Sequence, residues 1–333
     1  PIRRFPYVDL TKSVAGIRGL GVPNAIYGYW QVRRALIEII GGFDIIHGHI
    51  ACPMAVYAMT VAQAFGKPAI CKIAGSGSDW DLAVLRSTSM LGSKLARHAL
   101  KHMNMWIAMS GEIRRQLLEC GVEPARIRSI PNGVGVPNMK PKDGGAPARR
   151  FLYLGRLSRT ANRDCETVLI GFNEVARTHP DCELAFVGGG ERESQLRQLL
   201  ESLPHARPRT RFVGFADPEP WMEWADVVVQ PSRAEGMSNT LLEAMAAGIC
   251  CIANDIPANR EVLASGEVGI LVPVGSVDEL AAAMTRVVEV SGECAKWAVR
   301  GRQRVVEVYS IDHVADEYLR LYSDLMRTPV CRT

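Results

Sequence analysis

The chain has 333 residues, 47% of them hydrophobic, and a formal net charge of +4. This length and composition predict two domains with separate cores, and the small net charge argues against a nucleic-acid-binding protein. Nine cysteines without a C-x-x-C pair predict reduced thiols in a cytoplasmic protein, and no stretch approaches the roughly 20 apolar residues of a membrane span.

The first half of the chain alternates short apolar runs with helical patterns. Strands are predicted at 43–47, 68–73, 104–108 and 127–130. Helices are predicted near 28–40, 53–65, 81–101 and 110–120. This alternation predicts a parallel sheet covered by helices on both faces. Prolines and glycines then crowd residues 131–150, which predicts a linker.

The second half repeats the alternation. Strands are predicted at 150–154, 183–187, 211–213, 226–229, 250–253 and 270–272. Helices are predicted at 164–178, 191–203, 217–224, 238–247, 258–264 and 277–290. The pattern indicates a second doubly wound domain. A last helix at 311–327 has an amphipathic pattern.

Small and charged residues follow several strands of the second domain. They are Gly155 and Arg156, the glycines 188–190, Gly214 and Phe215, and the segment 231–236. Ligands of open α/β sheets bind beyond the carboxyl ends of the strands. We therefore expect these segments to converge on one crevice that faces the first domain.

Two glutamates flank a predicted helix start in that crevice. Glu235 precedes the turn 236–239, and Glu243 lies in the helix that the turn opens. Helix N-termini favour phosphate through their free N–H groups and their dipole. Ser238 and Glu243 are separated by about 7 Å of helix rise, the scale of a sugar and a ribose.

Two further features have both a functional and a structural interpretation. Arg156 directly follows a strand, and its guanidinium could hold a diphosphate or belong to a solvated basic loop. The run Gly188–Gly190 permits close approach to a nucleotide, and it is also typical of an ordinary strand–helix turn.

Seven motifs in this order resemble the retaining glycosyltransferases of family 4. They are D-I-I-H-G-H (44–49), I-A-M-S (107–110), I-P-N-G-V (130–134), Y-L-G-R-L-S (153–158), F-V-G-G-G-E-R-E (186–193), F-V-G-F (212–215) and E-G-M-S-N-T-L-L-E-A-M-A-A-G (235–248). The resemblance implies the α/β GT-B fold, with two Rossmann-like doubly wound domains facing a cleft. It implies domains at 1–138 and 148–308, with the helix 311–327 crossing back to the first domain.

The resemblance also implies roles for individual residues. Glu235 matches a glutamate beside the donor sugar, Glu243 one that binds the ribose, and Arg156 an arginine on the diphosphate. The backbone amides that would bind phosphate and sugar belong to Gly236, Met237, Ser238, Asn239, Thr240 and Leu241. The positions that match the nucleobase cradle are Gly188, Phe215, Ala216 and Asp217.

Three departures from the family pattern affect this site. Ala161 stands where a lysine is usual, and we expect Arg163, or else Arg159, to replace it. Ala74 stands where many members have a histidine that touches the donor sugar. The family begins with a strand and a Gly-rich loop, so we expect the first domain to be N-terminally truncated.

The first domain supplies candidates for the acceptor side, namely His49, Ser76 and Asp79. Asp79 and Asp81 form a D-x-D sequence, which could hold Mg²⁺ or Mn²⁺ or could cap a helix. His47 and His49 lack a nearby carboxylate cluster, so a metal site is not expected there. His47 is expected to be packed.

A basic helical face is the remaining feature of the first domain. It consists of Lys94, Arg97, His98 and Lys101. Such a face could dock on the anionic inner surface of a membrane, where lipid-linked acceptors reside, or it could be an ordinary amphipathic surface helix.

The resemblance implies a retaining glycosyltransferase of the hexosyltransferase type, and the groups predicted to hold the diphosphate suggest that it is metal-independent. It would move a sugar from a nucleotide-diphosphate donor to a glycan or lipid-linked acceptor in cell-surface polysaccharide or glycolipid synthesis, without a cofactor. The alternative is a degenerate, non-catalytic homologue that binds nucleotide or a partner protein. A dinucleotide-dependent oxidoreductase is disfavoured, since no G-x-G-x-x-G follows a first strand.

Overall fold

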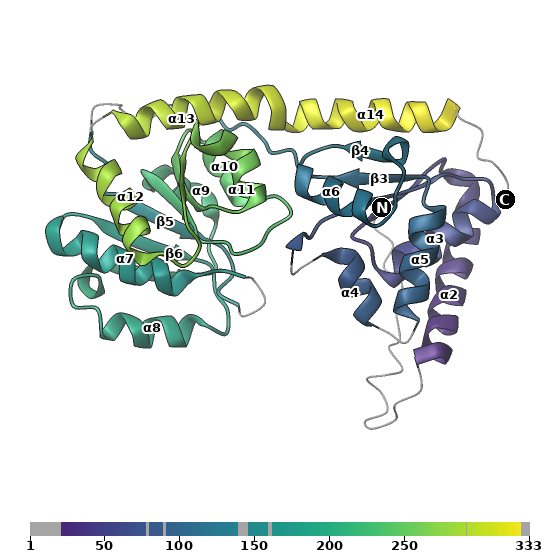
Figure 1. Ribbon diagram of the computed structural model, residues 1–333, viewed down its shortest axis with the longest axis horizontal. Helices are drawn as coiled ribbons and strands as arrows, with labels where there is room; N and C mark the ends of the chain where they lie inside the picture. The colour runs from purple at the N-terminus through teal and green to yellow at the C-terminus, as the bar shows by residue number, and fades with distance from the viewer. Residues whose placement is uncertain are drawn as a thin grey trace. The chain divides into compact units, whose positions relative to one another are not determined.

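The computed structural model describes residues 21–77, 80–88, 91–138, 146–158, 162–290 and 292–327, apart from the side chains of 21–25 and 88 (Figure 1). The chain divides into two compact units. The first comprises Pro1–Pro131 with Asp316–Thr333, and the second comprises Asn132–Ala315. Compared with the predicted domains, the second unit begins earlier and takes in the first residues of the last helix.

The first unit contains a four-stranded parallel sheet. Its strands are β1 (Ile46–His49), β2 (Ala69–Ile73), β3 (Met105–Ala108) and β4 (Ile127–Ser129), in that order across the sheet. The helices are α2 (Gly21–Ile37), α3 (Pro53–Ala64), α4 (Asp81–Thr88), α5 (Gly92–His102) and α6 (Gly111–Glu119). The final helix, α14 (Ile311–Arg327), belongs to this unit from Asp316 onward.

The single helix predicted at 81–101 is wrong, because the structure contains two helices, α4 and α5, at this place. The second helix begins at Gly92, which lies directly against the backbone of the first. A Cβ at this position would be 2.2 Å from the carbonyl oxygen of Leu85. Glycine therefore permits the two helices to cross more closely than any other residue would.

The second unit contains a six-stranded parallel sheet of order β10-β9-β8-β5-β6-β7. Its strands are β5 (Arg150–Leu154), β6 (Glu183–Val187), β7 (Thr210–Gly214), β8 (Val227–Gln230), β9 (Cys250–Asn254) and β10 (Ile270–Val272). Its helices include α7 (Cys165–Thr178), α8 (Glu193–Glu201), α9 (Pro218–Trp224), α10 (Asn239–Ala246), α11 (Pro257–Val262) and α12 (Val277–Glu289). Both parallel sheets confirm the predicted fold class.

The core of the second unit explains why its strands are readable from sequence. Phe151, Tyr153, Phe172 and Phe186 are completely buried, and β8 is buried along its whole length. A strand that is covered on both faces consists of a continuous run of apolar residues. The sequence therefore shows where each of these strands ends, and the loops that follow them contain the candidate site.

One helix of the second unit was not predicted. Helix α13 (Glu293–Arg304) continues into a π-helical turn, Val305–Tyr309. It packs through Gly301 against Met245, and the Arg302 guanidinium donates to the carbonyl oxygen of Ala246. The contacts of this helix are therefore partly polar, and its sequence lacks a broad apolar stripe.

Within the part of the chain that the structure describes, no helix is both long enough and apolar enough to cross a bilayer.

Candidate active site

The helix α10 begins just beyond the carboxyl end of β8, as the sequence predicts. Ser238 is its N-cap, and the Ser238 hydroxyl accepts a hydrogen bond from the Leu241 N–H at 3.3 Å. The segment Gly236–Ser238 is buried, whereas Asn239 is exposed. This arrangement places the start of a helix dipole at the ligand-binding edge of the sheet.

Glu235 is held by three hydrogen-bond donors that meet at one carboxylate oxygen. Its Oε1 accepts from the Arg163 guanidinium, from the Ser232 hydroxyl at 2.8 Å and from the Gln230 amide at 3.1 Å. The Glu235 side chain is only 12% exposed and that of Arg163 18% exposed. The carboxylate is thus oriented inside the site and paired with the Arg163 cation.

Gln230 connects this carboxylate with the helix start. It is the last residue of β8 and is completely buried. Its Nε2 donates to Glu235 and also to the Ser238 hydroxyl, the latter at 2.9 Å. The sequence reasoning missed Gln230 and Ser232, although a glutamine that ends a strand of valines was a visible signal.

Backbone pairing fixes the position of Arg163. The backbone of Arg163 pairs with that of Ser232 in an antiparallel bridge. The N–H of the next residue, Asp164, donates to the Pro231 carbonyl at 2.8 Å. The Arg192 guanidinium donates to the Arg163 carbonyl at 2.9 Å. The structure therefore brings the predicted Arg163 onto Glu235, while Arg159 and Ala161 lie outside the described residues.

The loops that follow β5 and β6 are stacked backbone against backbone. Gly188 has φ of +124°, and a Cβ there would lie 2.0 Å from the Gly155 carbonyl oxygen. Any side chain would separate the two loops. Arg156, in the first of these loops, has an exposed side chain, and its carbonyl accepts a hydrogen bond from the Tyr153 hydroxyl at 2.9 Å.

The loop after β7 presents an aromatic ring to solvent. Phe215 is 82% exposed, and its ring lies against Gly189 of the neighbouring loop. Ala216 and Asp217 are also exposed, and the Asp217 carboxylate caps α9 by accepting from the Glu219 N–H at 3.1 Å. An exposed ring beside a glycine loop is suited to stacking on a planar base.

Glu243 and the linker residue Asn132 complete the surroundings of α10. Glu243 occupies an exposed position of the helix, where partial desolvation by neighbouring atoms raises the pKa of its carboxyl. Asn132 donates from its amide to the Asn239 side chain at 2.7 Å. Sequence reasoning placed Asn132 in the I-P-N-G-V motif without a role, and its contact with α10 needed the fold.

The first unit places His47 and His49 on one face of β1. His49 is exposed at the carboxyl end of the strand, and the two rings stack at 4.4 Å. The Nδ1 atom of His47 hydrogen-bonds with the Tyr322 hydroxyl at 2.7 Å. Burial, with the nearby charges of His49 and Lys72, lowers the pKa of His47 to about 4. His47 is therefore neutral and packed beneath α14.

The D-x-D sequence has a structural use at its second aspartate. The buried Asp81 carboxylate accepts backbone N–H groups from Ala74 at 2.8 Å, Gly75 at 2.9 Å and Ala51 at 3.4 Å. It joins the loops that follow β1 and β2. Ser76 is buried beside it, and Asp79 lies outside the described residues. Among the described residues, no cluster of three His, Cys, Asp or Glu side chains could hold a metal ion.

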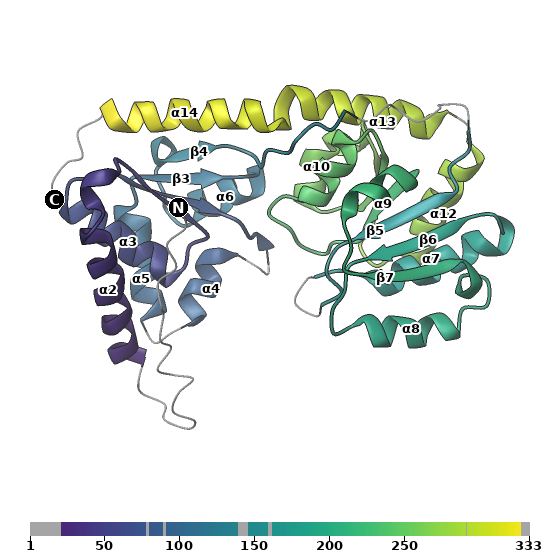
Figure 2. The same ribbon diagram turned by 180° about the vertical axis from the view of Figure 1, so that it is seen from behind.

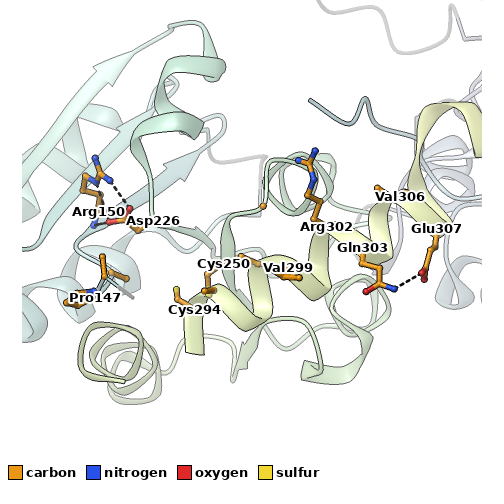
Figure 3. Close-up of a pocket in the computed structure, with 15 residues that line it drawn as sticks. Pro147, Arg150, Asp226, Cys250, Cys294, Val299, Arg302, Gln303, Val306 and Glu307 are labelled. Atoms are coloured by element: carbon orange, nitrogen blue, oxygen red, sulfur yellow. Dashed lines mark hydrogen bonds and ion pairs between the residues drawn. The ribbon is translucent and has the colours of Figure 1, made fainter. Parts of the chain in front are cut away.

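A pocket of about 660 Å³ lies elsewhere in the second unit (Figure 3). It is bordered by Arg150 and Cys250, the first residues of β5 and β9, and by Val299 of α13. Figure 3 shows the Arg150–Asp226 ion pair at one side of it. These residues mark the amino ends of the strands, so this pocket is separate from the site around Glu235.

Two family models match the chain, one in its first half and one in its second half. The family model "Glycosyltransferase Family 4" matches residues 4–136, and "Glycosyl transferases group 1" matches residues 148–289. A phosphatidyl-myo-inositol mannosyltransferase of Mycobacterium leprae is 30% identical over 306 residues, which cover 88% of this chain and 76% of the relative. The Mycolicibacterium smegmatis protein of the same name is 34% identical over 224 residues, covering 65% of this chain and 56% of that relative.

The solved structures extend the comparison to the fold. Anabaena Alr3699/HepE in complex with UDP-glucose aligns with a TM-score of 0.75 and 19% identity, covering 97% of this chain and 86% of that one. The two Rossmann-like units, and their similarity to the Anabaena structure, show that the protein has the GT-B fold. The chain belongs to glycosyltransferase family 4. The non-catalytic alternative has no support, since the relatives named here are transferases.

Proposed function

We propose that this glycosyltransferase transfers a hexose from a nucleotide-diphosphate sugar to a glycan or lipid-linked acceptor, with retention and without a metal ion. The observation that carries the proposal is the Glu235 carboxylate, fixed by Arg163, Ser232 and Gln230 beside the capped start of α10. The names of the relatives support a lipid acceptor, phosphatidyl-myo-inositol, for those proteins. The complex of the Anabaena protein with UDP-glucose supports a UDP-sugar donor for that protein.

The donor diphosphate would bind at the amino end of α10 and to Arg156. During transfer, the bond between the anomeric carbon and the phosphate oxygen breaks, and negative charge develops on the leaving diphosphate. Oriented amides and a guanidinium stabilise such charge, commonly the largest contribution to catalysis. They would take the place that a divalent cation holds in other transferases.

Retention follows if the acceptor attacks from the face that the diphosphate leaves. The acceptor oxygen forms the new bond to the anomeric carbon, and its proton passes to an oxygen of the departing phosphate. Glu235 would orient the sugar and stabilise the positive charge that builds on its ring. Glu243 would bind the ribose, and Phe215 would stack on the base.

The single most informative substitution is Glu235→Ala. We expect kcat to fall by about 100-fold or more, because the fixed charge near the reacting sugar is lost. Binding of the nucleoside diphosphate, measured by calorimetry, should stay within about threefold of wild type, since its contacts lie elsewhere. Full turnover by this variant with intact nucleotide binding would contradict the assignment.

The donor base can be identified before the acceptor is known. In a thermal-shift series with UDP, GDP and ADP, we expect one of the three to raise the melting temperature more than the others. Stabilisation by a ligand increases with its concentration relative to its dissociation constant. Sugar transfer with the matching donors then follows by nucleotide release. An absence of stabilisation by every nucleoside diphosphate would argue against a donor site.

A further inference from the structure

Two thiols of the second unit border the pocket that lies away from Glu235. Cys250 is the first residue of β9 and is buried, whereas Cys294 lies in the first turn of α13 and is partly exposed. Figure 3 shows both side chains on the same side of the pocket. The two thiols are hydrogen-bonded to each other. Thiols in direct contact can be joined by a disulfide without a large movement of the backbone.

The two cysteines differ in how readily they react. The hydrogen bond with Cys294, together with burial, raises the pKa of the Cys250 thiol well above its ordinary value. Cys250 therefore stays protonated at neutral pH and is a poor nucleophile by itself. Cys294 is reached from the pocket, whose volume of about 660 Å³ is sufficient for a small organic disulfide. The outer thiol is thus the one that an oxidant meets first.

The pair lies between elements that support the candidate active site. Helix α13 packs on β9 and on α10, and α10 and α13 lie side by side in both views (Figures 1 and 2). Gly301 of α13 lies against Met245, and the Arg302 guanidinium donates to the Ala246 carbonyl oxygen. A covalent bond between α13 and β9 would therefore fasten the helix that holds the carboxyl end of α10.

We propose that Cys250 and Cys294 are a redox-active pair, which a low-molecular-weight disulfide converts into an intramolecular disulfide. The Cys294 sulfur attacks the small disulfide, whose S–S bond breaks, and one small thiol leaves with the proton that Cys294 loses. The Cys250 sulfur then attacks the Cys294 sulfur of this mixed disulfide, and the second small thiol leaves with the Cys250 proton. Two protein thiols are oxidised, and one small disulfide is reduced to two thiols.

A metal site is the competing interpretation of two adjacent thiols. Structural zinc takes four ligands. The part of the chain that the structure describes contains no group of three His, Cys, Asp or Glu side chains that could hold a metal ion. The thiol pair therefore favours redox chemistry. The proposal is independent of the transfer chemistry, because neither cysteine belongs to the site around Glu235.

Peptide mapping by mass spectrometry, after treatment of the whole chain with oxidised glutathione, tests the proposal. In wild type we expect a mixed disulfide at Cys294 first and a Cys250–Cys294 linkage later, because protonated Cys250 makes the second step slow. The linkage should raise the melting temperature by about 5 °C, since it closes the long loop of residues 250–294. Dithiothreitol should reverse both changes.

Single substitutions separate the roles of the two thiols. Cys250→Ala should stop at the mixed disulfide on Cys294, and Cys294→Ala should leave Cys250 unmodified. Cys120→Ala removes another partly exposed thiol and is the control, which should form the linkage like wild type. Circular dichroism verifies that each variant folds. The proposal is overturned if wild type forms no Cys250–Cys294 linkage, if Cys250 is glutathionylated in the Cys294→Ala variant, or if the oxidised and reduced wild-type chains melt at the same temperature.

Discussion

At the scale of single residues, Gln230 decides how Glu235 is presented. Its amide nitrogen holds both Glu235 and the N-cap Ser238, whereas its Oε1 has no hydrogen-bond partner among the described residues. An apolar side chain of similar size would lose the two bonds and also remove the unpaired oxygen. In the proposed function, Gln230 would act through Glu235, as a positioning residue.

The variant Gln230→Leu isolates this role. We predict that kcat falls about tenfold while the KM for the donor changes little, because the role proposed for Glu235 is exerted mainly in the transition state. The melting temperature should change slightly. Gln116→Leu is the control, since the Gln116 side-chain oxygen also lacks a partner among the described residues and lies in α6 of the other unit. A Gln230→Leu enzyme with unchanged kcat would remove the positioning role.

Arg163 has a different importance, because it supplies the charge that compensates Glu235. Arg163→Ala should lower both kcat and the free energy of unfolding, the latter by up to about 3 kcal/mol, since a mostly buried carboxylate loses its cation. Arg163→Lys should recover part of both. Denaturant unfolding and steady-state kinetics measure the two effects, with the exposed Arg177→Ala as the control. Equal stability of the alanine variant and wild type would show that the ion pair is dispensable.

The limits of sequence reasoning are clearest at this scale. The motif around Glu235 and the helix start at Ser238 could be recognised from residue order alone. The contact between Arg163 and Glu235 could not, because pairing between two loops that are distant in sequence brings Arg163 to this carboxylate. The expectation that Arg163, or else Arg159, replaces the lysine that is absent at Ala161 started from the resemblance, and the structure adds a contact between Arg163 and Glu235.

At the scale of elements, the packing of α14 on β1 is stable when His47 is neutral. His47 lies against Tyr318, with ring centroids 5.5 Å apart, and hydrogen-bonds with Tyr322. Its pKa of about 4 is below the ordinary value of 6.5, so the unfolded chain binds the proton more strongly than the folded one. Stability contributed at neutral pH is consequently lost as the pH falls from about 6.5 towards 4.

We predict that His47→Gln flattens this pH dependence. The wild-type free energy of unfolding should decrease by about 1 to 2 kcal/mol more than that of the variant between pH 6.5 and pH 4.5, after allowance for solvent screening. Urea unfolding at several pH values measures the difference, and His313→Gln, at an exposed position of α14, serves as the control. Parallel pH curves for wild type and His47→Gln would refute the coupling.

Elements were predictable where burial dictates a simple pattern. The strands β5, β6 and β10 have the predicted bounds. In β5 and β6, burial on both faces demands apolar residues in the strand interior. Strand β10 is a partly buried edge strand, and its short apolar run was enough to locate it. Helix α13 was missed, since Glu293, Lys296, Arg300 and Arg304 interrupt its apolar positions. The break between α4 and α5 was also missed, because the tight contact at Gly92 is a tertiary feature.

At the scale of the whole molecule, the absence of a metal requirement is the sharpest prediction. Turnover should be unchanged by EDTA and by added Mg²⁺ or Mn²⁺, because Arg156 and the start of α10 would meet the diphosphate charge. Transfer assays with and without the chelator, with NMR of the product's anomeric proton, test both this independence and retention. Activity lost to EDTA and restored by Mg²⁺, or an inverted product, would contradict the proposal.

The division of the chain has a consequence for the order of folding during synthesis. The first unit is built from both ends of the chain, since Tyr318 and Tyr322 cover His47 from residues that follow the whole second unit. A ribosome delivers Asn132–Ala315 before it delivers the rest of α14. The second unit can therefore complete its core first, while the face of β1 around His47 stays uncovered until translation reaches the last helix.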